Sequence, residues 1–260
     1  IVHTHTAKAG FAGRVAAKMA GVPYIFHTYH GHVFSGYFSP RKTAFYKALD
    51  RFTAALSTHV ITVANYLRRD LTEVHHIAAP HKVSVLIPGY ELGDLYALQR
   101  GLSAFRDAHA IPLDAPLVGI VGRLVPIKNH DLFLQAAVKV SAGMPNTVFA
   151  IVGDGERRAE IEAQVDAFGL REHVRFTGWQ TDLPPIYSDL DCLVLCSHNE
   201  GLPSSIIEAL VTGVPVVATA VGGVVDLLAK GRGELIPAGD AQALAAGVID
   251  ALRNPTVKDG

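Results

Sequence analysis

The sequence predicts an α/β protein built from two parallel sheets, and three patterns support this prediction. Apolar runs of about five residues, short enough to be buried strands, recur along most of the chain, and 192–196 is one of them. Stretches of helical length separate these runs, which indicates βα units. The alternation stops once, at Pro88-Gly89, and resumes at Leu117, so the chain is expected to divide into two parts.

The first part, residues 1–100, is predicted to hold only four strands. The expected strands cover 1–6, 24–28, 59–63 and 82–87, and the expected helices cover 12–20, 40–56 and 64–73. Because a complete doubly wound domain has about six strands, the opening βα units of this one are expected to be missing. Ile1 begins inside a strand, and the chain stops at Asn254-Pro255 just after a helix. We therefore expect a fragment that is shortened at both ends.

The second part, residues 117–260, has a more regular alternation, and residues 101–116 are expected to link the two parts, with one short helix over 102–108. The expected strands cover 117–121, 147–152, 173–177, 191–196, 214–218 and 233–236, and the expected helices cover 129–142, 156–168, 183–188, 204–211 and 241–252. Six strands with helices between them predict a complete Rossmann-like domain. Such a domain binds its ligands at the carboxyl ends of the strands.

The composition is that of an ordinary globular protein. Among 260 residues, 49% are hydrophobic and the formal net charge is −1, so no overall basic balance favours nucleic acid as a partner. Both cysteines, Cys192 and Cys196, fall in one expected buried strand, which predicts reduced core thiols in a cytoplasmic protein. No apolar run approaches membrane-spanning length, and no signal peptide is visible.

The stretch 199–219 is the one around which the second part is organised. It lies between two apolar runs and reads as a loop followed by a helix that begins near Pro203-Ser204 and ends at Gly213. Free backbone N–H groups at such a helix start attract phosphate. Glu200 in the loop and Glu208 in the helix can face the same crevice from different heights. From the residues alone, a solvated Glu208 and a Glu200 that interacts with the helix dipole explain them equally well.

Two cations flank the first turn of the second part. Arg123 follows the strand 117–121, and Lys128 precedes a helix, where a positive charge opposes the helix dipole. A bound anion explains this arrangement better than stability does, although two solvated surface cations are the alternative. Gly153-Asp154-Gly155 ends the next strand at the same edge. A tight turn alone could account for these glycines, but a backbone that passes close to a nucleotide would also need them.

These segments resemble the donor-site signature of family 4 glycosyltransferases, which are retaining enzymes of the GT-B fold. The resemblance covers nearly the whole chain. It rests on Glu200-Gly201-Leu202-Pro203 with Glu208-Ala209-Leu210, on 213–219, on Gly122-Arg123-Leu124, on Lys128-Asn129 and on Gly153-Asp154-Gly155. It implies a GT-B protein with an incomplete first, acceptor-side domain and a complete second domain that binds a nucleotide-sugar donor.

The resemblance also implies a role for each matching residue. Arg123 and Lys128 would hold the diphosphate, with Gly153 and Gly155 beside the nucleotide, and Glu208 would accept from the ribose hydroxyls. Glu200 would hold the donor sugar, with backbone N–H groups of Gly201 and Leu202. His30 is similar to a functional histidine near that sugar, and His5 and His27 are further candidates for the same cleft. GT-B enzymes need no catalytic metal, so no metal or other cofactor is expected.

The function implied is transfer of a sugar from a UDP-sugar or GDP-sugar to an acceptor hydroxyl with retention, in polysaccharide or glycolipid biosynthesis. The alternatives are a GT-B nucleotide-sugar 2-epimerase and a nucleotide-binding fragment without turnover. The segment from His3 to Gly31 looks like enzymes that act on lipid-linked sugars, which implies a sugar or lipid-linked acceptor and a peripheral position at the inner face of the plasma membrane. Cations in the first part could face anionic lipid, or simply be solvated: Lys8, Arg14, Lys18, Arg41, Lys42 and Lys47.

Overall fold

The computed structural model describes residues 1–34 and 37–254. By their contacts, these residues form two compact units. Residues 1–90 and Asn199–Leu202 make the first unit, and residues 91–198 and those from Pro203 onward make the second. Each unit contains one parallel sheet, so the predicted α/β class with two parallel sheets is confirmed.

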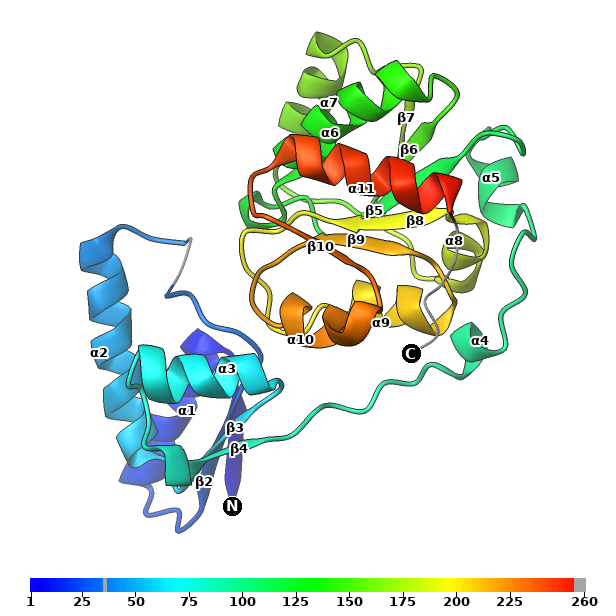
Figure 1. The fold of residues 1–260 in the computed structure, drawn as a ribbon. Coiled ribbons are helices and arrows are strands. Elements are labelled where there is room, and N and C mark those ends of the chain that lie inside the picture. Colours follow the sequence, from blue (N-terminus) through cyan, green and yellow to red (C-terminus); the bar gives the residue numbers. More distant parts are fainter. Residues whose placement is uncertain (35–36, 255–260) are drawn as a thin grey trace. The chain divides into compact units, whose positions relative to one another are not determined.

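The first unit has a four-stranded sheet in the order β1-β2-β3-β4 (Figure 1). Its strands are β1 (Val2–His5), β2 (Ile25–Tyr29), β3 (His59–Thr62) and β4 (Val83–Val85), and its helices are α1 (Ala7–Met19), α2 (Pro40–Leu56) and α3 (Asn65–Arg69). A π-helical turn over Asp70–Val74 continues α3 directly. The core packs Val60, Val63, Leu67 and Leu71 against Tyr29 and Phe34.

The second unit has a six-stranded sheet in the order β10-β9-β8-β5-β6-β7. Its strands are β5 (Leu117–Val121), β6 (Val148–Val152), β7 (Val174–Gly178), β8 (Cys192–Leu195), β9 (Val216–Thr219) and β10 (Glu234–Ile236). Its helices are α4 (Gly93–Tyr96), α5 (Ala104–Ala108), α6 (His130–Gly143), α7 (Arg158–Ala167), α8 (Pro184–Asp189), α9 (Ser204–Val211), α10 (Val224–Leu228) and α11 (Ala241–Arg253).

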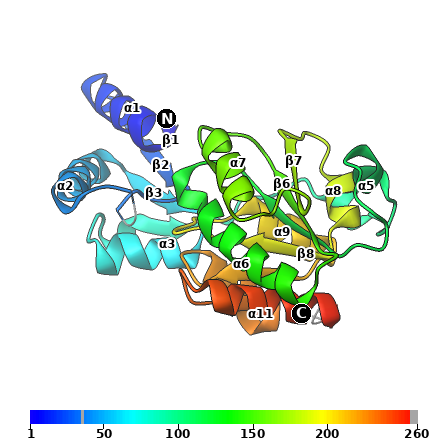
Figure 2. The ribbon, with the colours of Figure 1, turned by 90° about the horizontal axis from the view of Figure 1, so that it is seen from above.

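Helices cover both faces of this second sheet, and each face has its own core. On one face α6, α7 and α11 bury residues such as Phe133, Ile161 and Leu244 (Figure 1). Figure 2 shows α6 and α11 side by side, in agreement with their extensive contacts. On the other face α8, α9 and α10 bury residues such as Tyr187 and Ile206. Burial on both faces explains why the inner strands β5, β6, β8 and β9 are continuous apolar runs in the sequence.

Residues 91–116 pack into the second unit, whereas the sequence predicts a linker over 101–116. Leu95 and Phe105 join the apolar core of the second unit. Buried Asp189 accepts hydrogen bonds from the backbone N–H groups of Ser103, Phe105 and Arg106, at 2.9–3.0 Å, and so caps the start of α5. Because the capping carboxylate lies about 85 residues away in sequence, no local pattern reveals it.

Among the described residues, no helix combines the length and the apolar character that crossing a membrane requires.

Candidate functional site

The second sheet has its topological switch point between β5 and β8. These strands are neighbours in the sheet, yet the chain leaves β5 toward β6 and leaves β8 toward β9 on the opposite side. In open α/β sheets the loops after two such strands diverge, and the crevice expected between them at the carboxyl edge is where these sheets bind ligands. Gly122-Arg123-Leu124 follows β5, and residues 196–203 follow β8. Within the second unit, Gly122-Arg123-Leu124 and residues 196–198 thus flank the switch point.

The loop after β5 is fastened to the loop after β6. Gly122 N donates to Val152 O at 2.9 Å, and Leu124 N donates to Asp154 O at 3.0 Å. Gly153 has φ +134°, and a Cβ there would overlap Gly122 O; a Cβ at Gly155 would lie 2.5 Å from Leu124 O. The close packing of two loops therefore already requires both glycines. Their contact with a nucleotide stays a prediction.

Arg123 and Lys128 lie on either side of the Gly122 turn. Arg123 is exposed, and within the described part of the chain its side chain has no ion pair or hydrogen bond. Lys128 ends a 3-10 turn over Pro126–Lys128 and reaches back, so that a Cβ at Gly122 would lie 3.5 Å from Lys128 Cε. The two cations therefore share one edge of the crevice, where they suit an anionic group with several oxygens.

The loop after β8 is held against the 3-10 turn that contains Lys128. His198 N donates to Ile127 O at 2.9 Å, and the Cys196 thiol contacts Asn129 O at 3.1 Å. Asn129 adopts the left-handed conformation, with φ 53°, and α6 begins at the next residue. Both cysteines are free and buried, as expected. These contacts fix Lys128 beside the strand end from which 199–219 departs.

Glu208 lies on the second turn of α9 and is half-buried. Tyr187, on α8, has no exposed surface, and its hydroxyl donates to Glu208 Oε2 at 2.6 Å. Sequence reasoning singled out Glu208 but missed Tyr187. The only sequence signal for Tyr187 is an aromatic residue inside a helix, which is typical of any core.

His130, the first residue of α6, is the ionisable group buried next to Lys128. It is 1% exposed, and among the described residues neither ring nitrogen has a hydrogen-bond partner. Burial, and then the positive charge of Arg157, lower the pKa of His130 to about 4; Lys128 also lowers it, and Asp131 opposes the shift. The imidazole is therefore a neutral packing residue near pH 7.

This burial predicts a loss of stability in acid. Below pH 6.5 the unfolded chain takes up a proton at His130 that the folded chain does not bind until about pH 4, so the free energy of unfolding falls as the pH drops through this window. The contribution is about 2 kcal/mol between pH 7 and pH 4.5. We expect His130→Leu to remove this part of the acid sensitivity in urea titrations at the two pH values. A variant as acid-sensitive as the wild type would contradict the assignment.

In the first unit, His5 and His30 meet at the carboxyl edge of the sheet. His5 ends β1, His30 follows β2, and these strands are parallel neighbours. His5 Nδ1 lies 3.0 Å from His30 Nε2, and both side chains are exposed. Burial, and then the charges of His5 and His3, lower the pKa of His30. The pair can hold or pass a proton, which suits the predicted role of His30.

His27 requires a correction. It was expected as a cleft residue, but it is 1% exposed and its Nδ1 lies 2.9 Å from Thr4 Oγ1. Strand alternation places it on the opposite face from His5, against α1, where a Cβ at Gly10 would overlap its ring. Burial, and then the Arg14 charge, lower the pKa of His27 to about 3. His27 is therefore a packing residue between the sheet and α1.

Glu200, Gly201 and Leu202 belong to the short stretch that groups with the first unit. Within that group, Tyr66 Oη donates to Asn199 Oδ1 at 3.2 Å, and a Cβ at Gly201 would overlap the His30 carbonyl. Only glycine therefore fits at position 201. The contacts of these three residues with a donor sugar stay predictions.

A polar cluster in the first unit has the composition of a metal site but not the proton arrangement of one. His32, Asp70 and His75 offer ligand atoms within 4.8 Å of one another. Phe34 N donates to His32 Nδ1, so the ring proton is on Nε2, which donates to Asp70 Oδ2 at 2.7 Å. A metal on Nε2 would need that proton removed and the other nitrogen protonated. We therefore interpret the cluster as a set of hydrogen bonds that links the loop after β2 to the π-helical turn.

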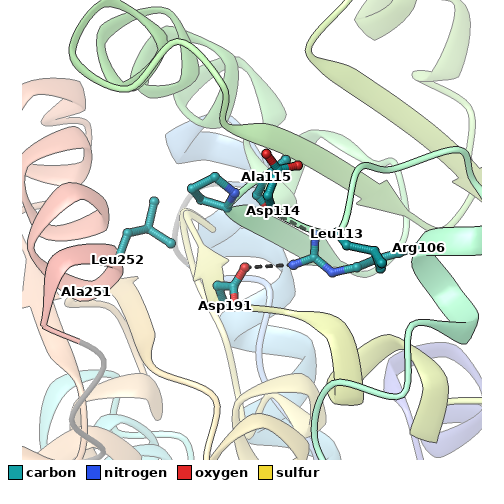
Figure 3. A pocket seen from close by; sticks show the side chains of 8 residues that line it. Arg106, Leu113, Asp114, Ala115, Asp191, Ala251 and Leu252 are labelled. Atoms are coloured by element: carbon teal, nitrogen blue, oxygen red, sulfur yellow. Dashed lines mark hydrogen bonds and ion pairs between the residues drawn. The ribbon is translucent and has the colours of Figure 1, made fainter.

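One pocket in the second unit lies at the other end of the strands (Figure 3). It is lined by residues that precede β5 and β8 and by Ala251 and Leu252 of α11. Its main polar group is already engaged: Arg106 donates to Asp191 Oδ2 at 2.9 Å and to the carbonyls of Pro112 and Ala115 at 2.8 Å each. These bonds hold residues 104–116 to the sheet, so the pocket is structural.

The chain matches two protein-family models. Residues 103–259 match "Glycosyl transferases group 1", and residues 1–89 match "Glycosyl transferase 4-like domain".

Curated relatives are similar along most of the chain. An Escherichia coli UDP-Gal:alpha-D-GlcNAc-diphosphoundecaprenol alpha-1,3-galactosyltransferase is 34% identical over 86% of this chain and 58% of its own length. A Streptomyces fradiae 2-deoxystreptamine N-acetyl-D-glucosaminyltransferase is 30% identical over 97% of this chain and 62% of its own length. The chain thus spans about three fifths of these relatives.

Solved structures share the fold. Anabaena Alr3699/HepE in complex with UDP-glucose has a TM-score of 0.83 and 24% identity over 97% of this chain and 69% of its own. WaaG, a glycosyltransferase involved in lipopolysaccharide biosynthesis, has a TM-score of 0.77 and 20% identity over 94% of this chain and 73% of its own. The predicted GT-B fold is confirmed.

Proposed function

Because the chain belongs to the group 1 glycosyl transferases, we propose that its second unit binds a nucleoside diphosphate sugar at the crevice between β5 and β8. This proposal is supported by the places of three residues in the chain: Arg123 and Lys128 follow β5, and Glu208 lies on α9, which follows β8, so all three belong to the segments that leave the two strands of the switch point. The two cations suit the diphosphate, on which negative charge develops as the glycosidic bond breaks. Glu208 suits the ribose hydroxyls, since a carboxylate accepts from neighbouring O–H groups.

We propose UDP as the nucleotide and a sugar or lipid-linked sugar as the acceptor. A neighbouring structure holds UDP-glucose, and the Escherichia coli relative is named for a UDP-sugar donor and a diphosphoundecaprenol-linked acceptor. The acceptor oxygen would bond to the anomeric carbon on the face from which the diphosphate leaves, and the hydroxyl proton would pass to the departing phosphate oxygen. The configuration of the sugar would therefore be retained. His30 and Glu200 are the candidates for contacts with the transferred sugar.

UDP release from UDP-sugars, measured with and without added acceptors, tests this function. We expect release that depends on the acceptor, with a product whose anomeric configuration, read by NMR, matches that of the donor. Inversion at C2 of the sugar without an acceptor would instead indicate an epimerase. Binding of the donor without release would indicate that this chain is a nucleotide-binding module.

We further propose that helix α2 contacts the surface of an anionic membrane. Phe45 and Phe52 lie one heptad apart on α2 and are 62% and 55% exposed, and Phe38, just before the helix, is 36% exposed. Arg41 and Lys42 are exposed beside them, and Lys42 Nζ lies 4.3 Å from the centre of the Phe38 ring. Exposed aromatic rings next to cations suit the interface of an anionic bilayer.

Not every expected cation fits this surface. Arg14 is fully buried, donates to Gly10 O and pairs with Asp50 at 3.4 Å, so it is not available to lipid. The cytoplasmic location, at the inner face of the plasma membrane, stays a part of this proposal.

Vesicle sedimentation tests the membrane contact. We expect the chain to bind vesicles with about one third phosphatidylglycerol, and Phe45→Ser with Phe52→Ser to weaken this binding at least about tenfold, because each ring contributes about 1.5 kcal/mol or more on burial. Phe168→Ser in the second unit, where Phe168 is 43% exposed, is the matched control and should leave binding unchanged. If Phe168→Ser weakens vesicle binding as much as the double substitution in α2 does, α2 is not the segment that contacts the membrane.

A further inference from the structure

The buried phenol of Tyr187 has one strong partner. Its hydroxyl lies 2.6 Å from Glu208 Oε2, whereas its other neighbour, the carbonyl oxygen of Ser205, lies 3.4 Å away. A hydroxyl has a single proton to donate, so the shorter contact to the carboxylate takes it. A hydrogen bond from O–H to a charged oxygen at this distance is among the stronger ones in proteins.

The environment keeps this proton on Tyr187. Burial, and then the negative charge of Glu208, raise the pKa of the phenol above its ordinary value. Tyr187 is therefore the donor near neutral pH, and Glu208 Oε2 is the acceptor. Because the ring has no exposed surface, its position is fixed by the surrounding core, which includes Ile206 and Ala209 of α9.

This bond leaves the other carboxylate oxygen for a ligand. In the described part of the chain, Tyr187 is the hydrogen-bond partner of the Glu208 side chain, and Oε1 has none. A glutamate side chain that is free on a helix surface samples several rotamers, and fixing it on ligand binding costs conformational entropy. Because Tyr187 already fixes the Glu208 side chain in the folded protein, this entropy is lost on folding and not on ligand binding.

We propose that Tyr187 is a positioning residue of the nucleotide site: it holds Glu208 Oε2 so that Oε1 can accept from the ribose hydroxyls. This inference rests on the proposed function and adds a residue to the site. A carboxylate that is held by a donor on one side can only accept on the other, so the arrangement favours a ligand with neighbouring O–H groups. It discriminates against a deoxy or dideoxy sugar, which leaves Oε1 desolvated and unpaired.

Calorimetric titration with UDP and with 2′,3′-dideoxyuridine diphosphate tests the role of Tyr187. We expect the wild type to bind UDP at least about tenfold more tightly than the dideoxy analogue. Tyr187→Phe keeps the ring and should weaken UDP binding about fivefold while leaving the affinity for the analogue unchanged. In a Glu208→Ala background, Tyr187→Phe should have no further effect, because the group that it positions is gone.

Two controls separate this role from a structural one. Tyr29→Phe removes the hydroxyl of another buried tyrosine, in the first unit, and should leave both affinities unchanged. Thermal unfolding checks that Tyr187→Phe is folded. Two results would overturn the proposal: a Tyr187→Phe variant whose affinities for UDP and for the analogue fall equally, or one whose two affinities are both unchanged. A wild type that binds no nucleoside diphosphate would overturn the proposed function itself, before Tyr187 is considered.

Discussion

Replacing Arg123 or Lys128 with alanine is expected to weaken nucleoside diphosphate binding by about ten- to a hundredfold each. Hydrogen bonds to charged groups contribute about 1.5–3 kcal/mol, and each 1.4 kcal/mol is a factor of ten in affinity. Arg123 lies exposed on the crevice edge without a side-chain partner among the described residues, so its removal leaves no buried group unpaired. The measurement is calorimetric titration of each variant with UDP.

The matched control is Arg171→Ala. Arg171 is also an exposed arginine of the second unit, but it follows α7 and pairs with Asp166 at 2.8 Å, away from the crevice. Its loss should leave UDP affinity unchanged. If Arg171→Ala and Arg123→Ala weaken binding equally, and the effect disappears at high salt, the cations act only through net charge.

Gly153→Ala is expected to lower the free energy of unfolding of the second unit by at least about 3 kcal/mol. The new Cβ overlaps Gly122 O, and alanine is strained at φ +134°. For a unit of this size, that loss corresponds to a fall in melting temperature of roughly 6–12 °C. The measurement is thermal unfolding followed by circular dichroism.

Gly169→Ala serves as the control for this prediction. Gly169 also has a positive φ, +69°, but a Cβ at this position would meet nothing within 4 Å, so only about 1 kcal/mol of backbone strain is expected. If the two substitutions have the same effect, backbone conformation and not loop packing accounts for the requirement for glycine at 153.

The fold was predictable because the inner strands of the second sheet, β5, β6, β8 and β9, are buried on both faces and are therefore continuous apolar runs in the sequence. Strand 117–121 and helices 40–56 and 204–211 agree with the predicted bounds, and most other elements agree within two residues. The helix over 224–228 was missed, since it is only five residues long and two glycines precede it. The expected helix over 64–73 ends instead in a π-helical turn, which has no distinct sequence pattern.

The places of the candidate residues were predictable where these residues follow strand ends and not where they depend on partners that are distant in the sequence. Arg123, Lys128 and Glu208 could be placed on one edge because parallel strands have a common direction. The hydrogen bonds of Tyr187 and Asp189 could not be predicted, because each joins residues about 20 or more positions apart. His27 was placed in the cleft because it lies near a strand end. Its pairing with Thr4 of β1, which puts it on the opposite face from His5, cannot be derived from the sequence.

The most direct test of the nucleotide-sugar site is calorimetric titration of the chain with UDP, GDP and ADP, repeated with Arg123→Ala and Glu208→Ala. We predict that the wild type binds UDP selectively and that both substitutions abolish or strongly weaken this binding. If a folded wild-type chain binds none of the three nucleotides, or if both variants bind as well as the wild type, the crevice between β5 and β8 is not the donor site.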